Sequence, residues 1–544
     1  MSAVSTPPRR RFPIRLRWIL AIAVAISVAI LVCIRIVIVR AQPILRARVI
    51  ETLSTRFKSR VELGELHVWI SHGLHVDGKG LQIYGATDPN PWEAGVQPLL
   101  EIGEFRFQTA LRNLFRDPMH VDTIFVSGLT LNIPPKNDRQ GLNKLRRRGG
   151  KMSIFVDHFV CTDTRLLINT QRPEKPPLEF DISDLRLKDI GPDQPLRFVA
   201  TLRNPKPVGD IQSSGLFGPL NENSPRDSAV KGDYSFTNAD LGTLKGIGGI
   251  LSSTGHYEGT LGRIEVNGET DTPDFRIASS GHRMPLRTDF HAIVDGTDGD
   301  TYLNPVKATF LHSWLTARGK VVRMKSGHGR QIDLDVAIDR AAIEDLLRLG
   351  VKTDPPVMTG ALQMKTIFSL PPGTEDIADR LRLAGEFHIP DASFTNDKVQ
   401  KRIDSMSLRG LGQTKQLQES PDTKVRSDLQ GTFTLRQGML AFSFLHFQVP
   451  GMHADMAGRY SLDGNTFDFH GLARMDAKLS QMTSGWKSIL LKPVDPFFAK
   501  HGNGAEIPFK ITGTRAEPHF GVDFHHKSEK VMDTHGEAAS GRED

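Results

Sequence analysis

The sequence predicts a mainly β protein with few helices that begins with a single N-terminal transmembrane helix. Three observations support this fold class: one long uncharged segment near the N-terminus, alternation of apolar and polar residues after residue 61, and frequent turn-forming residues. The 544 residues include 49 glycines and 33 prolines, an excess that indicates many turns. Only Cys33 and Cys161 are present, which excludes a disulfide-rich scaffold and a multi-cysteine metal site.

The predicted transmembrane helix comprises residues 18–39 and follows a basic tail, residues 1–17. At about 1.5 Å per residue, this segment is about 33 Å long, enough to cross a bilayer core of about 30 Å. Five arginines precede it, so the positive-inside rule places the tail in the cytoplasm and the rest of the chain on the far side. A signal peptide cleaved after Ala41 is the alternative, but Arg35 and Arg40 crowd that point.

The charge of the chain is concentrated near this segment. The net charge is +7, and residues 1–60 contribute +11 because they contain twelve Lys or Arg residues and one acid, Glu51. The other 484 residues therefore sum to −4. A nucleic-acid-binding protein needs a basic face on its folded part. The charge pattern therefore favours a membrane and argues against a nucleic-acid partner.

Residues 43–60 are expected to form an amphipathic helix, since apolar residues recur every four positions from Leu45 to Phe57. One interpretation is a helix packed on the end of the following domain. The other is a basic collar on anionic headgroups, and both can hold. The candidate membrane-surface residues are Arg40, Arg46, Arg48, Arg56 and Lys58.

From residue 61 onward, a period of two dominates and predicts antiparallel strands with one apolar face and one wet face. We expect an N-terminal β region at 61–202, a loop or linker at 203–230 and a C-terminal β region at 231–525. Helices are expected at about 239–250, 341–349, 395–406 and 477–491. The charged tail, 526–544, is expected to be disordered.

No motif indicates a catalytic residue, a cofactor site or a metal site, so we expect none. Asp295–Asp300 faintly resembles a calcium loop, but its glycines are misplaced and Val306 stands where such a loop has its bidentate glutamate. A hairpin turn is the better interpretation. Asp333, Asp335 and Asp339 share one parity on a predicted strand and fit a solvated face better than a catalytic carboxylate cluster.

So many strands with so few helices leave two ways to bury the apolar faces. Two sheets can pack on each other, or one strongly curved sheet can keep an apolar concave face for a hydrophobic ligand. Gly471 and Ala473 alternate with phenylalanines on one predicted strand, and such small residues favour free space inside.

Four segments, in this order, carry a resemblance to a known family: Leu45–Phe57 with Val61–Val68, Leu99–Ile102 with Val121–Ile133, Phe433–Leu440, and Ile507–Phe520. Together with the N-terminal span, they resemble the AsmA-like proteins of Gram-negative cell envelopes. The resemblance covers most of the chain. It implies an inner-membrane anchor and a long, curved antiparallel β-groove, taco-like and with short capping helices, of the repeating lipid-transfer type.

This resemblance implies a single-pass inner-membrane protein, with its N-terminus in the cytoplasm and its bulk in the periplasm, that moves lipid in support of outer-membrane biogenesis. Its expected partners are phospholipid or lipopolysaccharide-related lipids, with inner- or outer-membrane proteins in addition. The candidate lipid-contact residues lie on the apolar sides of three alternating segments: Ile332, Leu334, Val336, Ile338, Phe467, Phe469, Ala473, Met475, Ile507, Phe509 and Ile511.

Two rival functions remain open. The first is a scaffold or chaperone that affects outer-membrane protein assembly, or protein targeting to the membrane, without carrying lipid. The second is an envelope glycan hydrolase, which needs two carboxylates about 5–10 Å apart in an aromatic cleft. Only 5 Trp and 5 Tyr occur in 544 residues, which counts against carbohydrate binding.

The arginine asymmetry predicts the membrane topology. Alkaline phosphatase fused after Asp544 should be active, because the C-terminus is expected outside the cytoplasm. Retention of the chain in the membrane after a carbonate wash would distinguish an anchor from a cleaved signal. Activity of only a cytoplasmic reporter at the same site would contradict the orientation.

Overall fold

A computed structural model gives the fold of the chain. It describes residues 43, 46–51, 53–54, 59–71, 73–84, 97–110, 112–113, 116, 119–133, 154–168, 178–191, 194–221, 224–324, 329–352, 354–413, 424–463, 466–482, 504–514 and 517–523. Within these residues there are 25 strands and few helices, which confirms the mainly β, antiparallel fold class. The expected transmembrane helix at 18–39 and the expected tail at 526–544 lie outside the described residues. No described helix is long and apolar enough to cross a bilayer.

The chain forms two compact units: unit 1, Met1–Pro205 with Ile211–Gly232, and unit 2, Lys206–Asp210 with Asp233–Asp544. The strands from unit 1 to the boundary are β1 Val61–Ser71, β2 Gly73–Ile83, β3 Leu100–Thr109, β4 Met119–Ile133, β5 Ile154–Ile168, β6 Leu178–Ile190, β7 Leu196–Pro205, β8 Val208–Phe217 and β9 Ala229–Asp240. A short 3-10 helix, η3 Pro225–Asp227, precedes β9.

Unit 2 contains the remaining strands. They are β10 Ile247–Gly248, β11 Ile250–Thr260, β12 Arg263–Ile277, β13 Met284–Val294, β14 Thr301–Phe310, β15 Ser313–Arg323, β16 Arg330–Ala342, β17 Met358–Thr359, β18 Ala361–Leu370, β19 Arg382–Phe394, β20 Ser427–Arg436, β21 Met439–Val449, β22 Met452–Ser461, β23 Phe467–Met475, β24 Ala505–Gly513 and β25 Pro518–Val522. Its helical elements are η4 Leu241–Thr243, α3 Ile343–Gly350, α4 Ile377–Arg380, α5 Asp397–Gly410 and η6 Leu479–Met482.

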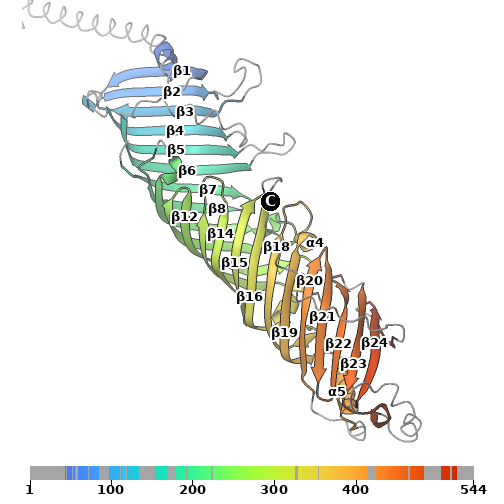
Figure 1. Cartoon of the computed structure of the whole chain (residues 1–544). Coiled ribbons are helices and arrows are strands. Elements are labelled where there is room, and N and C mark those ends of the chain that lie inside the picture. Colours follow the sequence, from blue (N-terminus) through green and yellow to red (C-terminus); the bar gives the residue numbers. More distant parts are fainter. Residues whose placement is uncertain are drawn as a thin grey trace, which may run out of the picture. The chain divides into compact units, whose positions relative to one another are not determined.

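Unit 1 is an open sheet in which β1 to β7 lie side by side in chain order (Figure 1). All its described pairs are antiparallel except β4 with β5, which run parallel. Residues 46–51 and 53–54 are helical, as expected, and Val49 and Ile50 pack against Leu63, Leu66 and Val76. The expectation of a helix packed on the end of the domain is therefore confirmed for these residues.

Unit 2 is a longer antiparallel meander in which most strands pair with the next one in the chain. Segments far apart in the sequence touch in this unit, which shows that the sheet curls strongly. The amide of Ile377 donates to the carbonyl of Lys245 at 3.4 Å, and His282 Nδ1 lies 3.0 Å from the carbonyl oxygen of Arg348. The open antiparallel sheet of this unit agrees with the sequence-based expectation.

The dry clusters of unit 2 lie at one end of the strands. Ile343 and Leu346 of α3 pack on a cluster that includes Ile338 and Leu362. Ile403 of α5 packs on Val449 and Met452, and η6 contributes a third cluster. Ile338 and Val449 are near the ends of their strands and Met452 begins its strand, so the antiparallel register brings these positions to the same end. Short helices therefore close this end of the sheet.

Buried Asp345 anchors α3 to the sheet. Its carboxylate is 2% exposed and accepts hydrogen bonds from the amide of His312 at 3.0 Å and the hydroxyl of Ser313 at 2.7 Å. The Ser313 hydroxyl in turn accepts from the amide of Ala342, which precedes the helix, at 2.9 Å. These bonds tie the start of α3, whose N-cap residue Ala342 makes no side-chain cap, to His312 and Ser313.

Two of the expected helices are confirmed: 341–349 corresponds to α3 and 395–406 to α5. The helix expected at 239–250 is wrong, because the segment ends β9, makes the single turn η4 and then forms β10 and the start of β11. The loop expected at 203–230 is also wrong in part, since β8 occupies Val208–Phe217. Of the helix expected at 477–491, the structure describes η6, and residues 483–491 lie outside the described residues.

Replacing Asp345 by alanine should lower the free energy of unfolding of unit 2 by about 2–3 kcal/mol, because it removes two hydrogen bonds to a buried carboxylate. Urea denaturation followed by circular dichroism measures the change. Asp339→Ala, at an exposed position of β16, is the control and should cost less than about 0.5 kcal/mol. Equal effects of the two substitutions would contradict this role of Asp345.

Candidate functional site

The candidate site is an apolar face that continues from strand to strand in unit 2. The cross-strand register aligns one residue from each of twelve strands in a row, and every member is apolar, aromatic or glycine. The row comprises Tyr257, Val266, Ala292, Leu303, Gly319, Leu334, Phe368, Leu383, Leu435, Leu440, Tyr460 and Phe467. Neither a charged nor an amide side chain interrupts it.

All eleven candidate lipid-contact residues lie on this same face. Leu334 and Phe467 belong to the row itself. The next row connects Val336 to Phe469 and Ile511, and a third connects Ile338 to Phe509. The remaining four share the parity of these residues on β16, β23 and β24: Ile332, Ala473, Met475 and Ile507. The sequence-based grouping is thus reproduced by the register.

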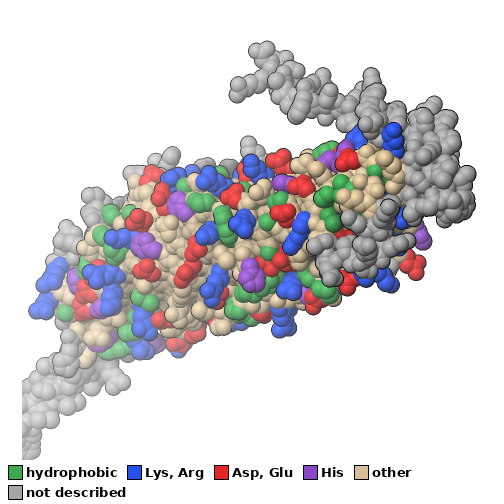
Figure 2. Space-filling view, turned by 90° about the horizontal axis from the view of Figure 1, so that it is seen from below, with side chains coloured by type: hydrophobic (Ala, Val, Ile, Leu, Met, Phe, Trp, Pro, Cys, Tyr) green, Lys and Arg blue, Asp and Glu red, His purple; other side chains and the backbone are tan. Residues whose placement is uncertain are grey.

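The opposite face of the same strands is polar. Arg474 forms ion pairs with Asp455 at 2.8 Å and Glu506 at 2.9 Å, and Glu506 and Asp455 raise the pKa of Arg474. His446 lies 2.6 Å from Asp455, and His388 lies 2.8 Å from Asp428. Figure 2 shows one side of the molecule, where acidic, basic and histidine side chains are interspersed rather than gathered by sign. The two faces of the sheet therefore differ sharply in polarity.

The apolar face is neither fully buried nor fully exposed. Ten of the twelve residues in the row are half-buried, and only Ala292 and Leu435 are buried. Among the described residues, the helices that pack on this face form clusters at one end of the strands. The neighbouring row, by contrast, has buried members, among them Phe433 and Phe469. The row from Tyr257 to Phe467 is thus the partly exposed part of this face.

The exposure divides the eleven candidates into two groups. Ile338, Met475 and Ile507 take part in the dry clusters, and Ala473 is buried. Phe469 is only 5% exposed because its ring packs between Phe442 and Phe467, with centroids 5.8 and 4.9 Å away. The half-buried candidates outside the clusters are Ile332, Leu334, Val336, Phe467, Phe509 and Ile511. These six are the accessible part of the face.

Aromatic rings lie over glycines of the neighbouring strand. A Cβ at Gly458 would lie 2.6 Å from the ring of Phe469, and one at Gly268 would lie 2.8 Å from the ring of Phe290. Gly458 pairs directly with Phe469 and Gly268 with Phe290. The lack of a side chain at these glycines therefore lets the rings lie close to the backbone of the neighbouring strand.

Unit 1 has an apolar face of the same kind. Two adjacent rows cross seven strands each, and all their members are apolar, aromatic or glycine. The first contains Leu66, Gly78, Phe105, Val126, Cys161, Leu185 and Ala200, and the second contains Val68, Val76, Phe107, Ile124, Phe159, Leu187 and Phe198. Cys161 is fully buried in the first row, where it packs as a small apolar residue, and burial raises the pKa of its thiol.

Of the candidate membrane-surface residues, Arg46 and Arg48 are described. Arg46 donates to the carbonyl of Leu63 at 2.7 Å, so its guanidinium group ties the helix to β1. Arg48 is exposed and pairs with Glu51 at 3.0 Å. Arg40, Arg56 and Lys58 lie outside the described residues.

The aspartates weighed as a carboxylate site lie on the polar face of β16. Asp333 accepts hydrogen bonds from Gln331 at 2.8 Å and Ser369 at 2.9 Å, while Asp335 and Asp339 are exposed. A hollow of about 690 Å³ lies beside Asp335 and is lined by acids and bases of neighbouring strands, among them Arg318, Lys365 and Glu386. Such mixed charges are typical of a solvated sheet face.

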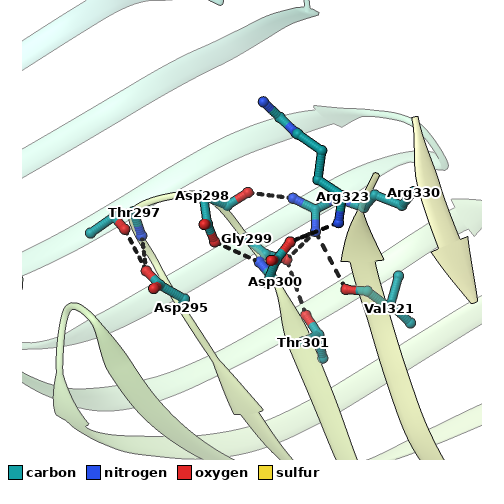
Figure 3. A network of polar contacts seen from close by, with 9 residues as sticks. All are labelled: Asp295, Thr297, Asp298, Gly299, Asp300, Thr301, Val321, Arg323 and Arg330. Atoms are coloured by element: carbon teal, nitrogen blue, oxygen red, sulfur yellow. Dashed lines mark hydrogen bonds and ion pairs between the residues drawn. The ribbon is translucent and has the colours of Figure 1, made fainter. Parts of the chain in front are cut away.

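The segment Asp295–Asp300 connects β13 to β14 as a hairpin loop, as expected (Figure 3). Its centre is occupied by the guanidinium group of Arg330, which donates to the carbonyls of Gly299 at 2.6 Å and Asp298 and lies 3.1 Å from Asp300 Oδ1. Gly299 has a φ of 78°, and a Cβ there would lie 2.6 Å from Arg330. An internal cation, the guanidinium group of Arg330, thus bonds to the oxygens of this loop.

One group of chemistry-bearing residues escaped the sequence analysis. His120, Asp122 and Asp157 of unit 1 place one nitrogen and two oxygens within 4.8 Å of one another. Asp157 is 35 residues from Asp122, and only the parallel pairing of β4 and β5 brings them together. No short-range sequence motif marks such a group.

Comparison with known proteins adds no assignment: no model of a protein family, no curated protein and no solved structure matches the chain.

Replacing Arg330 by alanine should lower the stability of unit 2 by about 1–3 kcal/mol, since several carbonyls and a carboxylate lose a charged donor. Thermal unfolding with and without calcium measures the effect, and calcium should not restore the loss. Arg323→Ala is the matched control, because only the backbone amide of Arg323 donates to Asp300. Rescue of Arg330→Ala by calcium would contradict this interpretation of the loop.

Proposed function

We propose that the chain binds lipid acyl chains on the apolar face of its β-sheet and lets them move along it. The observation that carries the proposal is the uninterrupted apolar row across twelve strands of unit 2, most of it half-buried. An apolar surface of this extent is unfavourable in water unless a ligand or partner covers it. Each buried methylene of a ligand would contribute about 0.8 kcal/mol.

The length of the row supports a sliding ligand rather than one fixed site. At about 4.8 Å between strands, twelve strands extend over about 53 Å along the sheet. One leaflet of a bilayer core is only about 15 Å thick, which is the approximate reach of one acyl chain. The face therefore offers room for a lipid at many equivalent positions. Because the side chains are similar at each position, no single position would bind an acyl chain with a much lower free energy than the others.

The closed end of the strands suggests how a lipid would be oriented. Helices α3 and α5 and the turn η6 cover the apolar face at one end. Acyl chains would point toward this end, and the polar headgroup would remain at the opposite, wetter side. Such transport requires no covalent chemistry, and we assign no catalytic residue or cofactor to it.

We further propose that the protein is an AsmA-like protein anchored in the inner membrane, with both units in the periplasm. The uncharged segment 18–39, the flanking arginines and the order of the four resembling segments support this assignment. Membrane lipid, phospholipid in the first place, would then be its ligand, and outer-membrane biogenesis the process that it serves. Envelope proteins at either membrane would be its partners.

A scaffold that assists outer-membrane protein assembly is the second candidate function. The interspersed charges and ion pairs of the polar face suit weak contacts with other proteins. This function would leave the apolar face without a lipid. It therefore predicts no lipid adducts on that face in the crosslinking test below. A glycan hydrolase has less support, because Asp333, Asp335 and Asp339 lie on the wet face of one strand.

Photo-crosslinking in cells tests lipid binding. A benzophenone amino acid placed at Leu334 or Ile511, on the apolar face, should form adducts with lipid. The same probe at the adjacent Asp335 or Lys510, on the polar face, should form none above background. Mass spectrometry of the purified full chain identifies the adducts. Equal yields on the two faces, or no lipid at Leu334 and Ile511, would contradict the proposal and favour the scaffold.

A further inference from the structure

The cluster of His120, Asp122 and Asp157 in unit 1 has the composition of a metal site. The parallel register pairs Val121 with Val156 and Thr123 with His158, so Asp122 stands opposite Asp157 on the neighbouring strand. His120 Nε2 lies 2.8 Å from Asp157 Oδ2. One ligand atom of each of the three residues lies within 4.8 Å of the others, and all three side chains are half-buried.

The surroundings hold the cluster in place. The phenyl ring of Phe155 stacks on the imidazole ring of His120, with centroids 4.8 Å apart. The hydroxyl of buried Thr109 donates to the backbone carbonyl of His120 at 2.6 Å. Asn113, which is 5% exposed, donates to Asp122 Oδ1 at 3.0 Å. Side chains of β3, of the segment after β3 and of β5 thus fix the ligand atoms of β4.

Within the described residues, no lysine or arginine balances the two carboxylates of the cluster. In the part of the chain that the structure describes, neither Asp122 nor Asp157 forms an ion pair with a lysine or an arginine. With a neutral imidazole, two carboxylates share a half-buried site and repel each other. A divalent cation between them would remove this repulsion and would use the imidazole lone pair as a third ligand.

We propose that His120, Asp122 and Asp157 bind a divalent transition-metal ion, with zinc as the best fit. Imidazole nitrogen and carboxylate oxygen bind zinc at about 2.0–2.2 Å, so two ligand atoms on a tetrahedral ion are about 3.4 Å apart. His120 Nε2 and Asp157 Oδ2 are 2.8 Å apart, and all three ligand atoms lie within 4.8 Å of one another, a range that includes this value. Three protein ligands leave a fourth position for water.

The ion would staple β4 to β5, whose connection differs from the rest of the sheet. They are the parallel pair among the described strands, and residues 134–153 separate them in the sequence. A tight hairpin cannot join parallel strands, so their pairing lacks the local turn that sets the register elsewhere. A metal ion that bonds to both strands would supply a fixed point for this register.

Zinc titration of the metal-stripped full chain in detergent micelles tests the site. Isothermal titration calorimetry should find one equivalent of Zn²⁺ per chain, and zinc should raise the melting temperature. Co²⁺ in place of zinc should give visible d–d absorption of a tetrahedral site without a thiolate charge-transfer band. His120→Gln, Asp122→Asn and Asp157→Asn should each weaken zinc binding by at least about 10-fold, since each removes a ligand of similar size.

The control is His388→Gln, which breaks a cross-strand pair of the same length, 2.8 Å to Asp428, in unit 2. This variant should bind zinc as the unaltered chain does. Circular dichroism establishes that each variant is folded before its titration. The absence of stoichiometric zinc binding, or the same affinity in the triple variant of His120, Asp122 and Asp157, would overturn the proposal and leave a simple ion pair.

Discussion

The structure depends on one constraint: strand register must keep most apolar side chains on the same face of a very wide sheet. Because side chains alternate with a period of two, a slip by one residue would turn a whole strand inside out. Irregularities do occur, for example between Phe290 and Ala292 and between Ile338 and Ala341. In the first, Phe290 still faces Val306 and Ala292 faces Leu303, so the bulge bends the strand without reversing its faces.

An apolar face without a second layer carries a cost in water, and the sheet reduces it in three ways. It curls, so that segments such as those around Lys245 and Ile377 meet across it. Its rings lie over glycines of adjacent strands, as Phe469 does over Gly458. Its helices close one end. What remains partly exposed is the row from Tyr257 to Phe467, in which most residues are half-buried.

Sequence reasoning succeeded where the information is local. The alternation on β16, β23 and β24 placed all eleven candidate residues on one face, and the helices expected at 341–349 and 395–406 correspond to α3 and α5. It failed at β8, because Pro205, Pro207 and Gly209 signal turns while the strand is set by its neighbours. It also failed at 239–250. This glycine-rich apolar segment was expected to be a helix, but it forms strand ends and the single turn η4. The cluster of Asp122 and Asp157 depends on a parallel pairing that no local pattern encodes.

The apolar face of unit 2 differs along the strands and across them, and this difference bears on how a bound ligand would move. Along a strand, the apolar face meets α3, α5 or η6 at one end, so motion in that direction is blocked. Across the strands, the rows repeat with nearly the same chemistry, and no charged side chain stands in the row through Leu334. An acyl chain bound to this face, as we propose, would therefore have one free direction, perpendicular to the strands. Each strand added to the sheet lengthens the apolar face across the strands and leaves its width along the strands unchanged. A meander of simple hairpins can therefore make a long and uniform apolar surface.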